Sequence, residues 1–362
     1  DYYASRGLGD VYKRQCLNKI KNLEMETVVS GIRPTGNLHL GNYFGAVKSF
    51  LQMQNEYNCF FFIADWHSLT THPRPENIRN SAKTILAEYL ACGIDPEKAT
   101  IYIQSDVREV AELYLYLNMN AGIGELMRTT SFKDKARQML HIDRVNTAEG
   151  DVEKEIFNEG NRHSVSAGLL TYPTLMAGDI IIHKAVKVPV GKDQEQNMEM
   201  ARRFARRFNS TFEVDFFPEP ASFHLTEKAV KVPGLDGSGK MGKSEGNAIY
   251  LIDDEKAIKK KVMKAVTDAG PTEPNSVKPE PIANLFAMMD IVSTKDTYDF
   301  FNEKYNNCEI RYGDLKKQLA EDINNFCAPI REKIIDIRSN EEYMEKVARM
   351  GAEKARESAA KT

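Results

Sequence analysis

Apolar residues in the first third of the chain alternate between two patterns. Three short, nearly continuous apolar runs are typical of parallel strands buried on both faces: residues 26–29, 58–65 and 100–104. Between these runs, apolar side chains recur at helical spacing in residues 43–57 and 76–93. Strands that alternate with helices predict an α/β fold with a doubly wound parallel sheet, and such sheets bind ligands at the carboxyl ends of their strands.

The middle of the chain continues the alternation less regularly. Helical patterns occupy three stretches, residues 109–132, 166–185 and 193–208. Pro173 breaks the second of them near its start, and residues 188–190 have a short strand pattern. Residues 133–162 are charged and irregular, so we expect an insertion or surface excursion there.

The two ends of the chain differ from this core. From residue 282 onward no strand pattern occurs, and the longest amphipathic helix is predicted for residues 312–337. Residues 1–24 lack the apolar core of a signal peptide and fit no fold, so we expect a non-native or disordered leader before a natural start at Met25. The predicted organisation is a leader at 1–24, an α/β domain at 25–255 with a helical insertion at about 109–186, and a helical domain at 256–362.

Composition narrows the functional classes. With 362 residues, 42% of them hydrophobic, the chain can form two domains with sizeable cores. A net charge of −3 excludes a surface coated in basic charge, so a nucleic-acid partner would have to bind a local basic patch. No apolar run reaches the roughly 18 residues of a transmembrane helix. The five cysteines form no CxxC pair, which predicts no zinc or iron–sulfur site, no other metal site, and free thiols in a reducing cytoplasm.

The turn at residues 30–42 joins the first strand to the first helix. It contains three glycines, a proline and His39. A turn of this kind exposes backbone N–H groups at a helix N-terminus, where a phosphate is favoured by the unpaired donors and the helix dipole. Taken alone, this first turn is equally compatible with phosphate binding and with an ordinary βα loop.

A second glycine-rich loop, at residues 232–246, carries Lys240, Lys243 and Ser244. Two lysines beside Gly237 and Gly239 make a mobile cationic loop that can close over a triphosphate, where each lysine acts as a point charge. The loop is weak evidence alone. It becomes strong evidence when it follows a His-Leu-Gly-Asn turn on a parallel-sheet core.

The two loops resemble the HIGH and KMSKS signatures of class I aminoacyl-tRNA synthetases. Five further stretches resemble the tryptophanyl branch of that family: residues 30–36, 41–43, 168–173, 188–194 and 312–314. The resemblance implies a Rossmann-like catalytic core and a helical anticodon-binding domain. It implies activation of L-tryptophan with ATP, release of pyrophosphate, and transfer of tryptophan to the 3′ end of tRNA(Trp). It also implies a cytoplasmic homodimer, with Mg²⁺ accompanying ATP.

By this resemblance, the catalytic residues are His39, Lys240 and Lys243. The residues implied for ATP binding come from both loops and from the stretch after the fourth strand: Arg33, Pro34, Thr35, Gly41, Asn42, Gly191, Lys192, Asp193, Val232, Lys240, Met241, Gly242, Lys243 and Ser244. Lys133 and Lys135 match positions of further phosphate- or metal-linked lysines.

The candidate tryptophan site centres on Asp179. Tyr172, Met176, Asp179 and His183 are spaced by four, three and four residues, which predicts one helix face. Asp179 is a lone acid in an apolar segment. Either an internal partner satisfies its carboxylate, or the carboxylate accepts the substrate's indole N–H, a group that only donates.

The choice of substrate depends on Met176. In similar tyrosyl enzymes a glutamine commonly stands there, whereas methionine suits a large flat ring, so we favour tryptophan over tyrosine. Gln194 and His67 complete the candidate tryptophan site by resemblance. A catalytically idle homologue and a small-molecule nucleotidyltransferase are the alternatives from other classes.

Three features depart from the family pattern. Gly242 stands where serine is usual, Arg33 stands where glutamine is frequent, and residues 136–162 are longer than in compact members. For anticodon recognition, Tyr305, Arg311, Tyr312 and Lys316 have suitable side chains, but surface or packing roles are equally open for each.

Overall fold

The computed structural model describes residues 25–70, 74–140, 165–191, 194–223, 232–237, 239–243 and 246–362. The expected leader at 1–24 and most of the long segment at 136–162 lie outside these ranges. In the described ranges, every helix is too short or too polar to cross a bilayer.

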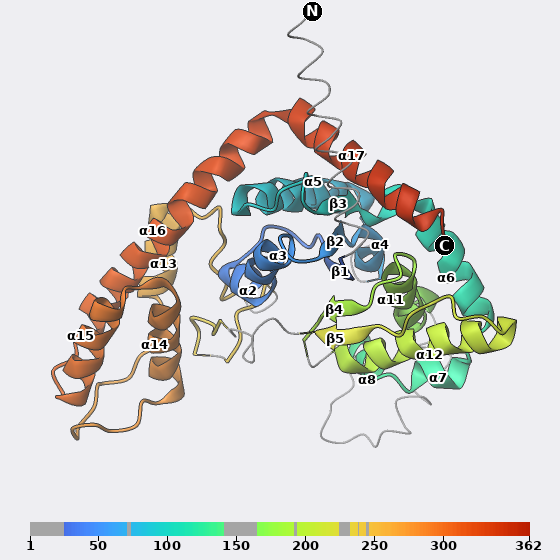
Figure 1. The fold of residues 1–362 in the computed structure, drawn as a ribbon. Helices are drawn as coiled ribbons and strands as arrows, with labels where there is room; N and C mark the ends of the chain where they lie inside the picture. The colour runs from blue at the N-terminus through green and yellow to red at the C-terminus, as the bar shows by residue number, and fades with distance from the viewer. Residues whose placement is uncertain are drawn as a thin grey trace, which may run out of the picture.

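One parallel sheet of five strands forms the centre of the described part of the chain (Figure 1). Its strands are β1 (Thr27–Ile32), β2 (Asn58–Ile63), β3 (Thr100–Ile103), β4 (Lys187–Pro189) and β5 (Ala221–Phe223). Their order is β3-β2-β1-β4-β5, and all pairings are parallel. The chain therefore adds β2 and β3 on one side of β1, and then adds β4 and β5 on the other side. This order confirms the predicted doubly wound sheet, and it places a topological switch point between β1 and β4.

β1 extends further than the apolar pattern predicted. It continues through Ser30 and Gly31 to Ile32, in register with residues 61–63 of β2. A Cβ on Gly31 would lie 2.6 Å from the ring of Phe62, so a larger residue would clash with the neighbouring strand. Glycine at this position lets β1 reach the start of the turn with its hydrogen bonds to β2 intact.

The helices of the first half cover the sheet. They are α2 (Leu40–Asn42), α3 (Lys48–Met53), α4 (Asp65–Leu69) and α5 (Pro75–Cys92), with a π-helical turn at Tyr43–Val47 between α2 and α3. The single helix predicted for 43–57 is thus a composite that starts earlier and ends at Met53. α5 ends as predicted at Gly93, whose φ of +104° is favoured by glycine.

The inserted helices differ from the sequence prediction in several places. They are α6 (Arg108–Met119), α7 (Ile123–Met127), α8 (Thr130–Met139), α10 (Ala167–Leu170) and α11 (Tyr172–Ile181), followed by α12 (Glu195–Phe212). The single helix predicted for 109–132 is wrong, because the chain turns between Asn120 and Gly122. The helix predicted to reach residue 185 ends at Ile181. Residues 133–139, expected to be irregular, are helical, with a buried Ala136. Strand β5 was not predicted, because three residues after Pro220 give no usable pattern.

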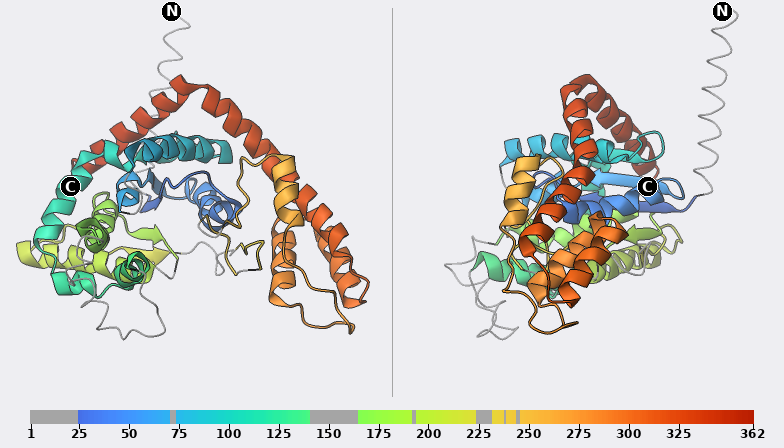
Figure 2. Two further views of the ribbon diagram at one scale, coloured as in Figure 1. Left: turned by 180° about the vertical axis from the view of Figure 1, so that it is seen from behind. Right: turned by 90° about the vertical axis from the view of Figure 1, so that its left-hand side faces the viewer.

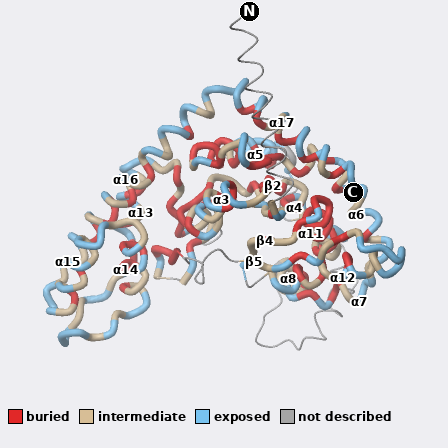
Figure 3. Tube along the Cα trace, in the orientation of Figure 1, coloured by how far each residue is buried: buried red, intermediate tan, exposed pale blue. Residues whose placement is uncertain are grey.

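Beyond residue 254, the described chain contains helices and no strands. These are α13 (Glu255–Met263), α14 (Glu280–Val292), α15 (Lys295–Asn306), α16 (Tyr312–Ser339) and α17 (Glu341–Ala359). α16 and α17 meet at Asn340 and form an inverted V over the sheet, which Figure 2 shows from two further sides. Buried positions lie along the inner side of the V and exposed positions along its outer side (Figure 3).

We call residues 255–339 the helical arm. Two of the arm residues considered for RNA contact have packing roles instead. Tyr305 is buried, and the Lys316 ammonium donates to the Ala265 carbonyl at 2.8 Å. The Tyr312 hydroxyl donates to Asp268 at 2.7 Å, and Arg311 is exposed.

α17 returns from the arm to the sheet and packs along the edge strand β3. The approach is closest at Gly351, where an added Cβ would lie 1.7 Å from the Ile101 carbonyl oxygen. Near the end of α17, Arg356 donates to the Asp106 carbonyl at 2.6 Å. The last helix therefore covers the β3 edge of the sheet. The domain boundary at 255/256 stays a prediction.

Substitution of Gly351 by alanine should destabilise the protein. The new methyl group would force α17 away from β3, and overpacking of this kind costs about 1–3 kcal/mol of unfolding free energy. Denaturant unfolding would measure the loss. Gly313→Ala in α16 is the matched control, since nothing lies within 4 Å of its added Cβ. An equally stable Gly351→Ala variant would contradict the close packing of α17 on β3.

Candidate active site

The two glycine-rich loops meet although more than 200 residues separate them. The Lys243 ammonium donates to the Gly36 carbonyl at 3.0 Å and lies 3.3 Å from the Thr35 hydroxyl. Behind this contact, the Leu40 amide donates to the Ile249 carbonyl, and the Leu251 amide to the Leu38 carbonyl, each at 3.0 Å. The structure therefore brings together the first turn and the second loop, as the sequence predicted.

The first turn is shaped by His39 and the glycines around it. His39 is buried, meets the ring of Tyr250 edge-on at 6.4 Å, and donates its amide to the Asn42 side chain at 3.1 Å. A Cβ on Gly41 would lie 2.9 Å from the His39 imidazole, so that ring leaves room only for glycine at the start of α2. Gly36 has a φ of +112°, which other residues rarely adopt. Pro34 is buried in the same turn.

The second loop is organised by Asn247, which the sequence analysis missed. Its side-chain oxygen accepts from the Gly242 amide at 2.9 Å, and its amide group donates to Asp236 at 2.9 Å and to the Lys240 carbonyl at 3.2 Å. An asparagine directly after a loop glycine was the available signal.

The buried Met241 side chain anchors the second loop to the core. The backbone amide of Met241 donates to the Val232 carbonyl at 2.9 Å. The neighbouring Lys240 side chain is exposed. Ser244 lies outside the described residues.

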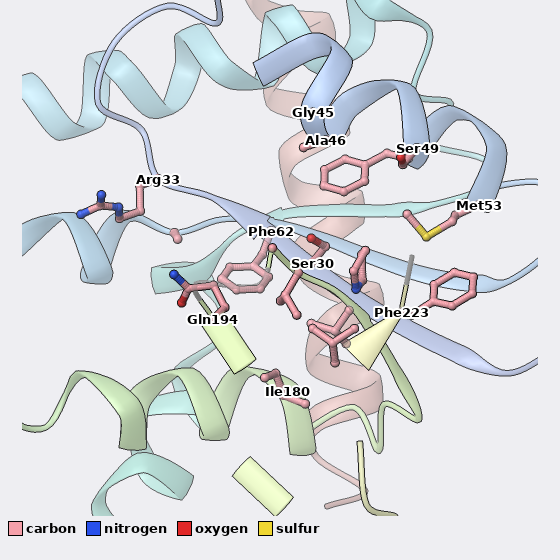
Figure 4. Close-up of a pocket in the computed structure, with 18 of the residues that line it drawn as sticks. Ser30, Arg33, Gly45, Ala46, Ser49, Met53, Phe62, Ile180, Gln194 and Phe223 are labelled. Atoms are coloured by element: carbon pink, nitrogen blue, oxygen red, sulfur yellow. The ribbon is translucent and has the colours of Figure 1, made fainter. Parts of the chain in front are cut away.

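A cavity of about 580 Å³ lies at the switch point of the sheet. Six of the predicted site residues line it: Arg33, His67, Tyr172, Met176, Gly191 and Gln194. Figure 4 shows it between the helical stretch that carries Gly45, Ser49 and Met53 on one side and Ile180 on the other, with Phe62 between them. Lys192 and Asp193 lie outside the described residues.

Asp179 lies behind the cavity wall and is fully buried. One carboxylate oxygen lies 2.8 Å from His67 Nε2, and the Gln104 amide donates to both oxygens at 2.8 and 2.9 Å. Burial raises the pKa of Asp179, while the hydrogen bonds from His67 and Gln104 lower it. The carboxylate thus has internal partners. Since an ionised carboxylate can accept about four hydrogen bonds, it also keeps capacity for a substrate donor.

Gln104 is a second residue that sequence reasoning missed. Its carbonyl oxygen accepts the Trp66 amide at 3.1 Å, which directs its NH₂ group toward Asp179. The signal was its place as the first residue after β3, at the carboxyl end of a strand.

His183, in contrast, was predicted to share the face of Asp179 but does not line the cavity. It lies beyond the end of α11, stacks on Phe60 at 4.1 Å, and burial lowers its pKa to about 3, so it is a neutral packing residue outside the cavity lining.

Positive charge gathers at the Arg33 side of the site. Lys135 lies 4.4 Å above the ring of Tyr172, which in turn meets His67 edge-on at 4.5 Å. Burial, and after it the Arg33 charge, together lower the pKa of Lys135 to about 8. The pKa of Lys243 is also lowered to about 8: burial and the Arg33 charge lower it, and the Glu88 charge partly opposes them. Cations that disfavour one another in this way favour an anionic ligand.

Comparison with known proteins identifies the family. The family model described as class I tRNA synthetases (W and Y) matches residues 21–328. The chain belongs to the class I tRNA synthetases.

Two relatives are similar in sequence to this class I synthetase along nearly its whole length. It is 70% identical over 338 residues to the tryptophan–tRNA ligase of Porphyromonas gingivalis, covering 93% of this chain and 97% of that protein. It is 38% identical to the tryptophan–tRNA ligase of Fusobacterium nucleatum, covering 92% and 94% of the two chains.

The fold agrees with a solved structure of the same family. The tryptophanyl-tRNA synthetase of Campylobacter jejuni, complexed with ADP and tryptophan, is 32% identical to this synthetase. It superposes with a TM-score of 0.78 over 92% of this chain and 96% of that chain. The described sheet, cavity and paired loops therefore belong to a fold that this protein shares with a solved class I synthetase.

Replacing Arg33 by glutamine should raise the pKa values of both Lys135 and Lys243, because it removes a cation that disfavours their protonated forms. NMR titration of the lysine side chains would measure the shifts. Lys278 is an internal control, since burial alone lowers its pKa. Unchanged titration of Lys135 and Lys243 would contradict the charge cluster.

Proposed function

We propose that this class I synthetase activates L-tryptophan with ATP to form tryptophanyl-adenylate and pyrophosphate, and then esterifies the 3′ end of tRNA(Trp). The observation that carries this proposal is the buried Asp179 carboxylate behind the Met176 wall of the cavity, in a chain 70% identical to a tryptophan–tRNA ligase.

Activation requires an attack of the tryptophan carboxylate on the α-phosphate of ATP. The protein contributes mainly positioning and stabilisation of charge on the leaving pyrophosphate. We assign the phosphates to the cationic side of the site, formed by Arg33 of the first turn together with Lys135 and Lys243. His39, Gly41 and Asn42 would hold the nucleotide at the start of α2, while Lys240 would close over it from the second loop. Mg²⁺ is expected to arrive with ATP.

We assign the indole ring to the cavity and its N–H to Asp179. Met176 and Tyr172 offer an apolar wall, and Asp179 offers an acceptor that His67 and Gln104 hold in place. A site built around a substrate donor can reject analogues that lack it by about 10⁴–10⁵. Tyrosine carries its donor at a different position, and the adaptable thioether of Met176 favours the larger ring.

The remaining parts of the proposal concern tRNA and location. The helical arm is proposed to contact the anticodon, with the exposed Arg311 as a candidate. Cytoplasmic location is proposed because tRNA is the second substrate and because Cys59, Cys92, Cys308 and Cys327 are free thiols, as in a reducing compartment.

Tryptophan-dependent exchange of pyrophosphate into ATP tests the reaction directly. Wild-type protein should exchange with tryptophan far better than with tyrosine. Asp179→Ala should lose nearly all exchange, because the indole N–H loses its acceptor and His67 and Gln104 lose theirs. Met176→Gln should lower the ratio of tryptophan-dependent exchange to tyrosine-dependent exchange.

Asp215→Asn, which changes an exposed carboxylate, is the control and should keep wild-type exchange. Since Asp179 is buried, thermal unfolding of each variant separates loss of fold from loss of chemistry. Equal exchange with tyrosine would overturn the substrate assignment.

We also propose a homodimer. Its support is an exposed apolar surface along the end of α6 and the start of α7, formed by Leu115, Tyr116, Met119 and Ile123. Met119 is 74% exposed and Ile123 is 65% exposed, which is unusual for apolar side chains grouped on one surface of a monomer. A second copy of the chain would bury this surface, and a two-fold axis would bring equivalent helices together.

Light scattering coupled to size-exclusion chromatography should give twice the mass of one chain. Met119→Glu should shift the protein toward the mass of one chain, because it places a charge in the proposed interface. Val277→Glu is the matched control, since Val277 is 92% exposed in the helical arm. A wild-type protein that stays monomeric at micromolar concentration would refute the dimer.

A further inference from the structure

A second fully buried carboxylate, Glu88 of α5, contacts the first turn but is not part of the cavity lining. One oxygen accepts the Leu38 amide at 2.6 Å. The other accepts from the Arg338 guanidinium of α16 at 3.1 Å. The same guanidinium nitrogen donates to the Asn37 side chain at 3.0 Å. Glu88 and Arg338 therefore hold the two residues that directly precede His39.

These contacts join parts of the chain that lie far apart in sequence. Glu88 is 50 residues from Leu38 and 250 residues from Arg338. Arg338 lies in the last turn of α16, the long helix that also packs on α13 and α14 in the helical arm. In Figure 1 this end of α16 rises above α5, at the apex of the inverted V. The cluster is thus the point where the arm's longest helix reaches the first turn.

Fold stability does not explain the cluster well. Removing a carboxylate from water is costly, and a buried ion pair usually returns little net stability compared with apolar residues of similar size. Burial raises the pKa of Glu88 to about 7, against the lowering effects of the Leu38 hydrogen bond and of the Arg338 and Lys243 charges. Burial therefore favours the neutral form of Glu88, and the fold bears this electrostatic cost at a residue that contacts Leu38 of the first turn.

The influence of Glu88 extends to the second loop. Its charge raises the pKa of Lys243, whose ammonium contacts Thr35 and Gly36 of the first turn. The first turn is consequently held on two sides. Lys243 of the second loop contacts Thr35 and Gly36, and the segment after that loop pairs with Leu38 and Leu40. The Glu88–Arg338 pair holds Asn37 and Leu38.

We propose that Glu88 and Arg338 are positioning residues for ATP, which fix the Asn37–His39 turn and link its position to helix α16. The inference rests on the proposed function, since it deepens the role of the same nucleotide site. Neither residue lines the cavity, so the pair acts through the turn rather than on a substrate.

A double-mutant cycle tests this proposal. Glu88→Gln keeps an acceptor for the Leu38 amide but removes the charge that holds Arg338, and Arg338→Gln removes the other half. Each single variant should lower kcat/KM for ATP in tryptophan-dependent exchange by about tenfold, and the double variant should lose little more, as expected for residues that act as one unit. The KM for tryptophan should stay within about twofold of wild type, because the Asp179 side of the cavity is untouched.

A matched control comes from the same helix. Lys83 of α5 forms an exposed 2.7 Å pair with Glu341 at the start of α17, so Glu341→Gln removes a pair between α5 and the C-terminal helices without touching the first turn. It should leave every kinetic constant unchanged. A merely structural role for Glu88 and Arg338 would reduce the folded fraction and kcat for both substrates, with an unchanged KM for ATP.

Calorimetric titration with ATP gives a second readout that does not require catalysis. About tenfold weaker ATP binding in each single variant, with no further loss in the double variant, supports the proposal even if wild-type protein shows no exchange with tryptophan. In that case the proposed function fails and the positioning role stands. Additive losses in the double variant, or ATP affinity equal to that of wild type, would overturn the positioning role.

Discussion

The central position of β1 is the constraint on which the site depends. β1 pairs in parallel with β2 on one side and with β4 on the other, so its carboxyl end lies where the connections of the sheet diverge. Phe62 of β2 occupies the space above Gly31, and only glycine lets β1 run on to the turn. The cavity opens at that point, and Arg33 follows directly after the strand. The first turn, the cavity and the cationic cluster all take their places from the end of this strand.

Two buried carboxylates hold different parts of the site. Asp179 lies behind the cavity and is fixed by His67 and Gln104, whereas Glu88 lies behind the first turn and is fixed by Leu38 and Arg338. Burial raises the pKa of both, so each weakens the fold to some degree. The apolar core offsets this cost. What the charges contribute is a fixed position, because every partner comes from a different part of the chain.

The sequence predicted the parallel sheet and both glycine-rich loops, since these depend on local patterns such as the apolar run of β2. It failed where the deciding contact is distant. β5 has three residues and exists through its pairing with β4, and the helix break after Asn120 has no proline to mark it. In the site, the family motifs gave the residues at the cavity and in the loops. Gln104, Glu88 and Asn247 were missed because each acts by holding another residue. For Gln104 and Asn247 the sequence offered only their positions, after a strand and after a loop glycine, and no family motif.

If the indole N–H binds Asp179 as proposed, the support around this carboxylate explains how one acceptor discriminates between two aromatic amino acids. A carboxylate that faced the cavity freely could rotate to accept a phenol hydroxyl or an indole N–H. With one oxygen bonded to His67 and both bonded to Gln104, rotation would break existing hydrogen bonds, so the direction of the remaining lone pairs is set before any ligand enters. A donor at a different position would then leave the carboxylate poorly satisfied in a buried site, where such a mismatch is costly. Selectivity of this kind resides less in Asp179 itself than in the two residues that prevent it from moving.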